Sequence, residues 1–383
     1  MVTRRLKTID AAPPEHASYR SDDDYLGLSL ALAARGLGNV WPNPAVGCVV
    51  ERDGVIVGRG WTQAGGRPHA ETMALQQAGT RAAGATAYVS LEPCAHHGQT
   101  PPCAEALIAA GIARVVIAAA DPDGRVDGRG AEMLRAAGIK VDWAEADMAA
   151  AAEALNAGFL SKTLRRRPLV TLKLASTLDG RIATAGGESQ WITGPEARAR
   201  GHLMRAEHDA ILVGIGTALA DDPELTCRLP GLGPRSPVRV VLDSRLRLPG
   251  GSRLAGGARE HPLWLLTGLG QGSQTLEDSG AEILTVPLGA DDGIDLAAAL
   301  ACLAERGITR LLVEGGSAVT TAFLSAGLVD NLAWFRAPGV IGGDGLPVFG
   351  DLDLTVLANM PRFKCQTIES LGDDVLESYV HQA

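Results

Sequence analysis

Residues 69–103 decide the fold of the N-terminal half, and they read HAETMALQQAGTRAAGATAYVSLEPCAHHGQTPPC. The pattern predicts a helix over His69–Gln77, a short apolar strand over Ala87–Leu91 and a second helix over Ala104–Ala110. Cys94 follows the strand, and we expect it to open a helix whose N-terminus favours a thiolate. Helices that alternate with short apolar strands indicate an α/β domain with a largely parallel sheet.

The same alternation extends along the chain in both directions. Upstream, we expect a helix over Asp22–Leu37, and Arg52-Asp53-Gly54 between two apolar runs predicts a hairpin. Downstream, a helix over Met148–Lys162 precedes the basic segment Arg165–Pro168, where we place a domain boundary. Strands and helices alternate again after it, so the second domain is also expected to be α/β. The predicted parts are a flexible tail (1–21), a first domain (22–165) and a second domain (166–383).

Composition excludes several classes of protein. The chain has 383 residues, of which 46% are hydrophobic, so it can form two cored domains. A net charge of −9 and only 4% aromatic residues disfavour a nucleic-acid partner, whereas a small anionic substrate needs only local donors. The N-terminus lacks a secretory pattern, and no apolar run reaches the ~18 residues of a membrane helix. Six cysteines do not make a disulfide framework, so we expect a cytoplasmic protein with no membrane partner.

His69, Cys94 and Cys103 together predict a catalytic zinc site. One imidazole and two thiolates supply three tetrahedral ligands and leave the fourth position to water, whose pKa zinc lowers to about 7. Glu71 suits a proton shuttle between that water and a leaving amine, as in the zinc nucleobase deaminases. Two alternatives remain open at this point. The cysteines could be ordinary buried thiols, as we expect for Cys48, or His96 or His97 could complete a structural site.

The loop between the two cysteines has eight residues instead of the two of the nucleobase deaminase pattern. We expect this longer loop to carry a substrate-recognition group, His96. Trp41–Gly47, His69-Ala70-Glu71 and Pro93–Cys103 resemble the bifunctional riboflavin biosynthesis proteins, the RibD family. The resemblance implies a cytidine-deaminase-like three-layer α/β/α domain in which Asn43 lines the base pocket. Family members often carry a basic residue where Gln99 stands.

In the second domain, Val313-Glu314-Gly315-Gly316-Ser317 reads as a strand, a glycine pair and a helix start. Such a turn can cradle a phosphate on free N–H groups, or it can be a tight turn with glycine for geometry alone. It lacks the G-x-G-x-x-G spacing of a dinucleotide fold. Leu178-Asp179-Gly180, Glu188–Thr193, Leu219–Pro223 and Glu314-Gly315-Gly316 are similar in order and spacing to the reductase of the same family.

This second resemblance implies a dihydrofolate-reductase-like α/β domain that uses NADPH. The implied cofactor contacts are Ala175, Trp191, Thr217, Asp221, Ser244, Gly316, Ser317, Ala318, Val319, Thr320, Thr321 and Ala322. The implied substrate contacts are Ser189, Arg205, Leu225, Arg228 and Glu314. Arg205 and Arg228 suit a ribose phosphate, because a guanidinium binds phosphate with paired N–H groups.

The expected function is that of a two-site enzyme of riboflavin biosynthesis. The first site deaminates 2,5-diamino-6-(5-phosphoribosylamino)pyrimidin-4(3H)-one, and the second reduces the ribosyl group of 5-amino-6-(5-phosphoribosylamino)uracil to ribityl with NADPH. The resemblance also implies a homo-oligomer. Two other classes stay open: a nucleic-acid deaminase with an added binding domain, and a zinc-stabilised binding module without catalysis. Ammonia release from the diaminopyrimidine distinguishes them.

Overall fold

The computed structural model describes residues 21–98, 101–124, 126–270, 272–289 and 292–382. Contacts divide the chain into two compact units that are each discontinuous in sequence. Among the described residues, the first comprises Ser21–Ala33, Val46–Trp61 and His69–Ala152. The second comprises Ala34–Ala45, Thr62–Pro68 and the residues from Glu153 onward. All but the last residue of the predicted tail lies outside the described residues.

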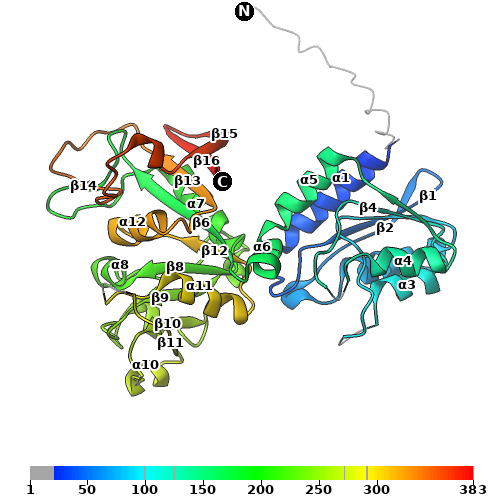
Figure 1. Ribbon diagram of the computed structural model, residues 1–383, viewed down its shortest axis with the longest axis horizontal. Coiled ribbons are helices and arrows are strands. Elements are labelled where there is room, and N and C mark those ends of the chain that lie inside the picture. Colours follow the sequence, from blue (N-terminus) through cyan, green and yellow to red (C-terminus); the bar gives the residue numbers. More distant parts are fainter. Residues whose placement is uncertain (1–20, 99–100, 125, 271, 290–291, 383) are drawn as a thin grey trace, which may run out of the picture. The chain divides into compact units, whose positions relative to one another are not determined.

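The first unit is a five-stranded sheet with helices on both faces (Figure 1). Its strands, in spatial order, are β2 (Val55–Trp61), β1 (Gly47–Arg52), β3 (Thr86–Val89), β4 (Arg114–Ile117) and β5 (Lys140–Trp143). Its helices are α1 (Asp22–Ala33), α2 (Ala70–Ala78), α3 (Cys103–Ala109), α4 (Arg129–Ala136) and most of α5 (Ala146–Leu155). Strand β1 pairs antiparallel with β2 and β3, whereas β3, β4 and β5 run parallel. Helices α1 and α5 cover one face and α3 and α4 the other (Figure 1), which gives three layers.

Helix α2 lies unusually close to strand β2, and two glycines make this possible. A Cβ atom at Gly58 would lie 2.1 Å from the backbone oxygen of Ala74, and one at Gly60 would lie 2.2 Å from that of Ala70. Any larger residue would push the helix away, because real Cβ atoms do not approach backbone that closely. These contacts fix the start of α2, which carries the predicted zinc ligand and proton shuttle.

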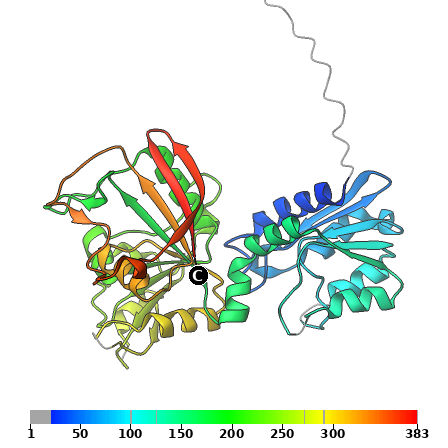
Figure 2. The ribbon, with the colours of Figure 1, turned by 45° about the horizontal axis from the view of Figure 1, so that its top comes forward.

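The second unit is built on a nine-stranded sheet (Figure 2). Its strands, in spatial order, are β11 (Glu282–Thr285), β10 (Leu263–Thr267), β9 (Val238–Leu242), β8 (Ala210–Gly214), β12 (Arg310–Val313), β6 (Leu169–Ser176), β13 (Asn331–Arg336), β16 (Asp374–His381) and β15 (Phe363–Leu371). The sheet is parallel from β11 to β13 and antiparallel from β13 to β15. A separate pair joins β7 (Arg181–Ala183) to β14 (Leu346–Pro347).

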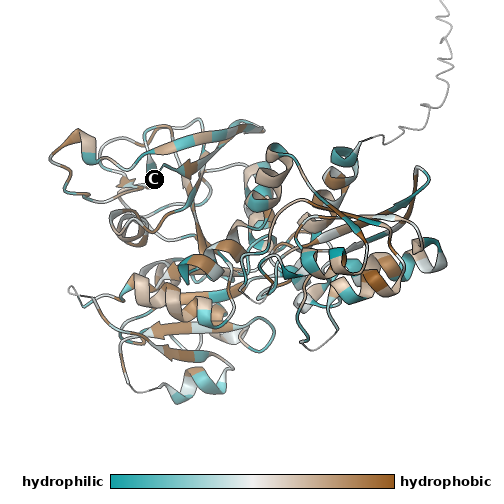
Figure 3. Ribbon diagram, turned by 45° about the vertical axis from the view of Figure 1, so that its right-hand side comes forward, coloured by the Kyte–Doolittle hydropathy of each residue, from teal (hydrophilic) through white to brown (hydrophobic). Residues whose placement is uncertain are grey.

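Helices pack against this sheet and enclose its apolar side chains. They are α6 (Ala157–Arg165), α7 (Pro195–Ala206), α8 (Ile215–Asp221), α9 (Arg253–Gly256), α10 (Gln274–Asp278), α11 (Leu296–Glu305) and α12 (Ser317–Ser325). One apolar cluster includes Val240 and Leu311, and a second includes Val241 and Leu312, because alternate residues of a strand point to opposite faces. Figure 3 shows the hydrophobic character of these strands.

Several predicted elements need correction. Helix α1 ends at Ala33 and a single 3₁₀ turn, Ala34–Gly36, replaces its predicted last part. The predicted helix over 148–162 is two helices, α5 and α6, because Asn156 leaves helical geometry and its side-chain oxygen accepts a hydrogen bond from Ala45 N. The first sheet is mixed rather than largely parallel, because strand β1 runs against both of its neighbours. In the part of the chain that the structure describes, we find no helix with the length and apolar character to cross a membrane.

Acid is expected to destabilise the second unit through His208. This imidazole is buried, donates from Nδ1 to Met204 O at 2.7 Å and accepts from Thr171 Oγ1 at 3.0 Å. Burial, with Arg310 nearby, lowers the pKa of His208 to about 3. The unfolded chain therefore binds the extra proton first, and stability falls as the pH drops from about 6.5 towards 3.

Urea unfolding at pH 7.5 and 5.5 tests this expectation. Between these values, wild type should lose about 1.4 kcal/mol more than His208→Gln, as a titration near pH 6.5 requires. Equal losses in the two proteins would contradict the assignment.

Candidate functional site

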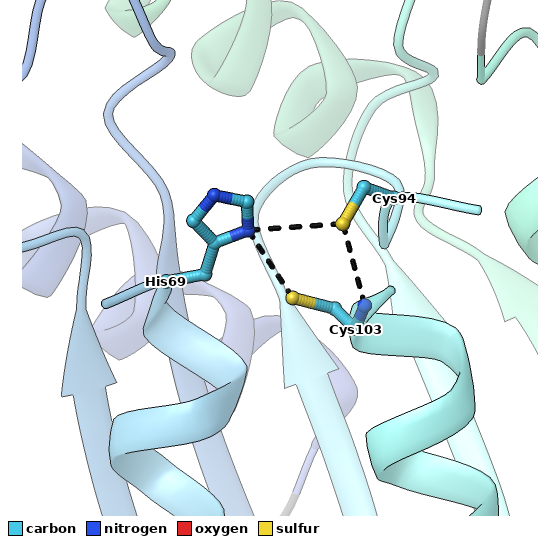
Figure 4. Close-up of side chains that lie close together, drawn as sticks. All are labelled: His69, Cys94 and Cys103. Carbon is cyan, nitrogen blue, oxygen red and sulfur yellow. Dashed lines mark hydrogen bonds between the residues drawn. The ribbon is translucent and has the colours of Figure 1, made fainter. Parts of the chain in front are cut away.

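His69, Cys94 and Cys103 converge in the first unit, as Figure 4 shows. His69 is the N-cap residue of α2, and Cys103 is the first residue of α3. His69 Nδ1 lies 3.3 Å from Cys103 Sγ and 3.7 Å from Cys94 Sγ. The three ligand atoms all lie within 4.8 Å of one another. Residues separated by 34 positions in sequence thus meet at one point.

Cys94 does not open a helix, contrary to the prediction. It lies in the loop that follows β3, and the next helix starts only at Cys103. Pro101 and Pro102 precede that helix, and a proline fits the first turn better than the interior of a helix. The loop nevertheless returns Cys94 to the helix start, since Cys103 N donates to Cys94 Sγ at 3.3 Å. The expected stabilisation of a thiolate by helix amides is therefore present, but it comes from α3.

Glu71 lies beside this cluster with only 3% of its surface exposed. Burial and the nearby Cys94 together raise the pKa of Glu71 to about 7, although His69 and a hydrogen bond from Cys103 act in the opposite direction. Hydrogen bonding from Cys103 and His69 lowers the pKa of Cys94 to about 4. The hydrogen bond to Cys94, together with burial, raises the pKa of the Cys103 thiol. Glu71 can therefore both take up and release a proton near neutral pH.

The three donors fit a zinc ion. Tetrahedral bonds of ~2.1 Å to nitrogen and ~2.3 Å to sulfur place two such donor atoms about 3.6 Å apart. The two nitrogen–sulfur distances, 3.3 and 3.7 Å, lie close to this value without any rearrangement of the chain. Among the described residues, no fourth His, Cys, Asp or Glu joins the group. This arrangement is typical of catalytic zinc sites, which keep one position open.

The other predicted residues of this domain have mixed outcomes. His97 is not placed as a ligand, because its Nε2 lies 2.9 Å from Glu105 Oε1. His96 is half-buried in the loop after Cys94, and its Nδ1 has no partner among the described residues. Asn43 belongs to the second unit, where its amide donates to Gly66 O at 3.1 Å. Gln99 lies outside the described residues.

The second unit contains a cavity of about 1020 Å³ at the carboxyl ends of β6, β8 and β12. Thirteen of the predicted reductase residues line it: Ala175, Ser189, Trp191, Arg205, Thr217, Asp221, Arg228, Glu314, Gly316, Ser317, Ala318, Val319 and Thr320. Ser244, Leu225, Thr321 and Ala322 are not among its lining residues. Leu225 is buried in the apolar core, and Thr321 Oγ1 accepts a hydrogen bond from Gly350 N instead.

The glycine turn before α12 has the geometry of a phosphate cradle. A Cβ atom at Gly315 would lie 2.6 Å from Val319 Cβ, and one at Gly214 would lie 2.6 Å from Val319 Cγ2. Gly316 N donates to Thr217 Oγ1 at 3.1 Å, which ties the turn to α8. Residues Gly316–Thr320 at the start of α12 line the cavity, where the first-turn N–H groups of a helix can bind a phosphate. These residues fit a nicotinamide cofactor.

A buried ion pair dominates the other side of the cavity. Arg205 Nε and Nη2 each donate to the Glu314 carboxylate at 2.9 Å, and Arg205 Nη1 donates to Thr226 O. Arg205 and Lys173 hold the pKa of Glu314 down to about 2 despite its burial. The Arg205 N–H groups that were predicted to bind a phosphate therefore already bind the Glu314 carboxylate.

Lys173 is a functional candidate that the sequence analysis missed. It lies on β6, lines the cavity, and places its Nζ 3.6 Å from Glu314 Oε2 and 5.6 Å from the centre of the Phe335 ring. The available signal was the single charged residue in a largely apolar strand, Leu169–Ser176. A cation in that position is expensive to bury unless it has a partner.

Two family models match the chain. One, the cytidine and deoxycytidylate deaminase zinc-binding region, covers residues 20–119. The other, the RibD C-terminal domain, covers residues 168–376. Together they confirm the predicted fold class and its order along the chain.

Known proteins also match over nearly the whole chain. The riboflavin biosynthesis protein RibD of Escherichia coli is 43% identical over 369 residues, which cover 92% of this chain and 98% of that protein. The structure of Acinetobacter baumannii RibD is similar with a TM-score of 0.86 at 38% identity, over 94% of this chain and 99% of that one. The Thermotoga maritima diaminohydroxyphosphoribosylaminopyrimidine deaminase/5-amino-6-(5-phosphoribosylamino)uracil reductase gives 0.83 at 36% identity, with 94% and 99% covered.

Purified protein is expected to carry one zinc ion per chain. Cys103→Ser should lower zinc affinity by more than roughly 100-fold, since changes to outer-shell groups alone cost up to that much. Cys365→Ser is the matched control, because Cys365 is an exposed cysteine of the other unit and should retain full zinc. Elemental analysis after dialysis against a chelator measures both. Full zinc in Cys103→Ser would rule out the ligand assignment.

Proposed function

This chain belongs to the RibD family of riboflavin biosynthesis proteins, and from that premise we propose that its two sites act in turn on one phosphoribosyl pyrimidine. The family combines a zinc-binding deaminase domain with a reductase domain, and this chain has both. The first reaction is deamination of 2,5-diamino-6-(5-phosphoribosylamino)pyrimidin-4(3H)-one. The second is reduction of the ribosyl group of 5-amino-6-(5-phosphoribosylamino)uracil to ribityl. The convergence of His69, Cys94 and Cys103 beside buried Glu71 is the observation that carries the proposal.

In the first site, His69, Cys94 and Cys103 hold zinc, which supplies an activated water when bound. Glu71 takes the proton from the attacking water and returns it to the leaving amine. Its burial supports this role, because a carboxyl group with a pKa of about 7 transfers protons in both directions at neutral pH. Asn43 and His96 bind the base, as the resemblance implies. The Nδ1 atom of His96 is buried and has no partner among the described residues, and a hydrogen bond to the base would satisfy it.

In the second site, NADPH supplies a hydride when bound. Gly316–Ala322 hold its phosphates at the start of α12, and Ala175, Trp191, Thr217, Asp221 and Ser244 complete the cofactor contacts. Ser189, Arg205, Leu225, Arg228 and Glu314 serve the substrate. Of these, Arg205 positions Glu314 and does not bind the phosphate directly, because its Nε and Nη2 groups already donate to the Glu314 carboxylate. Leu225 and Ser244 act from outside the cavity lining, through the backbone that carries them.

Lys173 is assigned to proton delivery during the reduction. Opening of the ribosyl ring at C1′ releases an oxygen that needs a proton, and the Lys173 ammonium lies at the cavity surface. Glu314 Oε2 lies 3.6 Å from Lys173 Nζ, and this ion pair orients the side chain in the cavity. The Phe335 ring lies 5.6 Å from the Lys173 Nζ, within the range of a cation–π contact.

The wider organisation follows the family. We propose domain limits at 22–165 and 166–383, a cytoplasmic location and a homo-oligomeric state. The RibD C-terminal domain model, which begins at residue 168, supports the limit between the two domains. One purified chain that releases ammonia from the diaminopyrimidine and then oxidises NADPH would establish both activities. Release of ammonia without subsequent NADPH oxidation would contradict the second half of the proposal.

Glu71→Gln is expected to abolish deamination without loss of zinc. The amide cannot carry the proton, so the rate should fall by roughly 10² to 10⁴-fold. Reduction of the uracil substrate by the same variant should remain at the wild-type rate, which serves as the internal control for folding. Ammonia release, metal content and NADPH oxidation are the three measurements. Full deaminase activity with zinc bound would remove Glu71 from the mechanism.

Lys173→Met is expected to slow reduction by roughly 10² to 10⁴-fold while deamination continues. Methionine keeps the length and apolar stem of the side chain but cannot deliver a proton. Lys364→Met, at an exposed position on β15, is the control and should behave as wild type. Stopped-flow absorbance of NADPH separates the hydride step from binding. An unchanged hydride step in Lys173→Met would leave the ring opening to another group.

A further inference from the structure

The cavity of the second unit has a large exposed aromatic side chain at its edge, Trp191. This residue lines the cavity, and 67% of its surface is exposed. A covered indole removes a large apolar area from water, and stacking against a second ring adds to that stabilisation. A single exposed tryptophan on a protein surface needs no explanation by itself. The contacts that hold Trp191 at the cavity are therefore the informative observation.

Arg198 contacts Trp191 from α7. Its Cζ atom lies 4.8 Å from the centre of the Trp191 ring, over the face of the indole, which is the geometry of a cation–π contact. Arg198 Nη1 also donates a hydrogen bond to Thr193 O. One guanidinium thus holds both the ring of Trp191 and the backbone two residues further along. Since Arg198 lies in the first turn of α7, these contacts tie the loop before the helix to the helix itself.

The loop that carries Trp191 has few other attachments. It follows β7 and ends at Gly194, whose N–H donates to Asp374 Oδ2 at 2.6 Å. Within the part of the chain that the structure describes, the bond from Arg198 is the only hydrogen bond made by residues 189–193. The position of Trp191 therefore depends on Arg198.

The charge of Arg198 has no carboxylate partner among the residues that the structure describes, unlike two other arginines of α7. Arg200 lies 3.7 Å from Glu207 Oε2. Arg205 binds Glu314 at 2.9 Å. Because no carboxylate neutralises Arg198, its full charge acts on the face of the indole, and this attraction keeps the ring in place.

We propose that Arg198 is a positioning residue for the cofactor. Its guanidinium covers one face of the Trp191 indole, and the exposed part of the ring stacks on an aromatic ring of NADPH in the cavity. This inference rests on the proposed function and deepens it, because Trp191 is one of the cofactor contacts proposed there. NADPH has two flat rings, nicotinamide and adenine. Both offer the same stacking chemistry, and fragments of the cofactor distinguish them.

Substitution of Arg198 tests the inference first. Arg198→Met keeps an unbranched side chain without a cation or a donor, so the Kd for NADPH should rise roughly fivefold, the order of a cation–π contact. The Kd for NADH should rise by the same factor, because the contact does not involve the 2′-phosphate. At saturating cofactor, kcat should stay within about threefold of wild type, since the lost interaction acts on binding. Isothermal titration calorimetry and steady-state kinetics measure these values.

A double-mutant cycle shows whether Arg198 acts through Trp191. Trp191→Leu removes the ring, and Arg198→Met added to it should cause no further loss of affinity. Trp191→Phe keeps an aromatic face and should bind NADPH within about threefold of wild type. Arg200→Met is the matched control, because Arg200 lies on the same helix outside the cavity lining. The same cycle with reduced nicotinamide mononucleotide and with 2′,5′-ADP identifies the ring, since only the fragment that stacks on Trp191 should lose affinity.

The outcomes separate this inference from the proposed function. Additive losses in the double variant, or fragments that bind all variants equally well, would overturn the positioning role. A loss confined to NADPH, with NADH unaffected, would also overturn it, because Arg198 would then be a phosphate ligand. If wild type binds NADPH and Arg198→Met binds it equally well, the inference alone is refuted. If wild type does not bind NADPH, the proposed reduction is refuted together with the inference.

Discussion

Close packing of a helix against a strand, permitted only by glycine, sets the position of both sites. In the first unit, Gly58 and Gly60 let α2 approach β2 so closely that a methyl group at either position would collide with the helix backbone. In the second, Gly214 and Gly315 leave room for the side chain of Val319 on α12. In each case the helix start carries proposed site residues: His69 and Glu71 at the start of α2, and Gly316–Thr320 at the start of α12. The positions of the proposed site residues therefore depend on close backbone packing at glycines several residues away.

Electrostatics distinguishes the two sites. The first site contains groups whose protonation state can change. Burial brings the pKa of Glu71 to about 7, and hydrogen bonds from Cys103 and His69 favour the thiolate form of Cys94. The second contains a fixed charge pattern, since Arg205 and Glu314 neutralise each other and remain ionised together. The contrast suits the two reactions. A hydrolytic deamination moves protons repeatedly, whereas a hydride transfer mainly needs cofactor and sugar held in register.

Sequence reasoning found the chemistry better than the geometry. The metal ligands and Glu71 could be predicted because few other roles require an imidazole, two thiolates and a carboxylate at those spacings. The loop at Cys94 could not, because the two prolines that delay α3 act on backbone conformation rather than on a periodic pattern. Arg205 was expected to contact the substrate, and it lines the cavity, but its ion-pair partner Glu314 is 109 positions away in sequence. Lys173 was not predicted because the sequence of its strand is typical of a buried core strand. Only the tertiary fold shows that Lys173 lines a cavity.

The discontinuous units also bear on how such a protein can be divided. The segments Ala34–Ala45 and Thr62–Pro68 precede the zinc-binding residues in sequence, yet they pack with the residues from Glu153 onward. In that body, Arg235 donates to Leu37 O, and the space beside Gly38 is filled by the backbone of Ala206. Dividing the chain at Glu153 into two separate proteins would thus strip these segments of their packing partners. In this chain, therefore, the two units are not simply consecutive in sequence: two segments that precede the zinc-binding residues belong to the second unit.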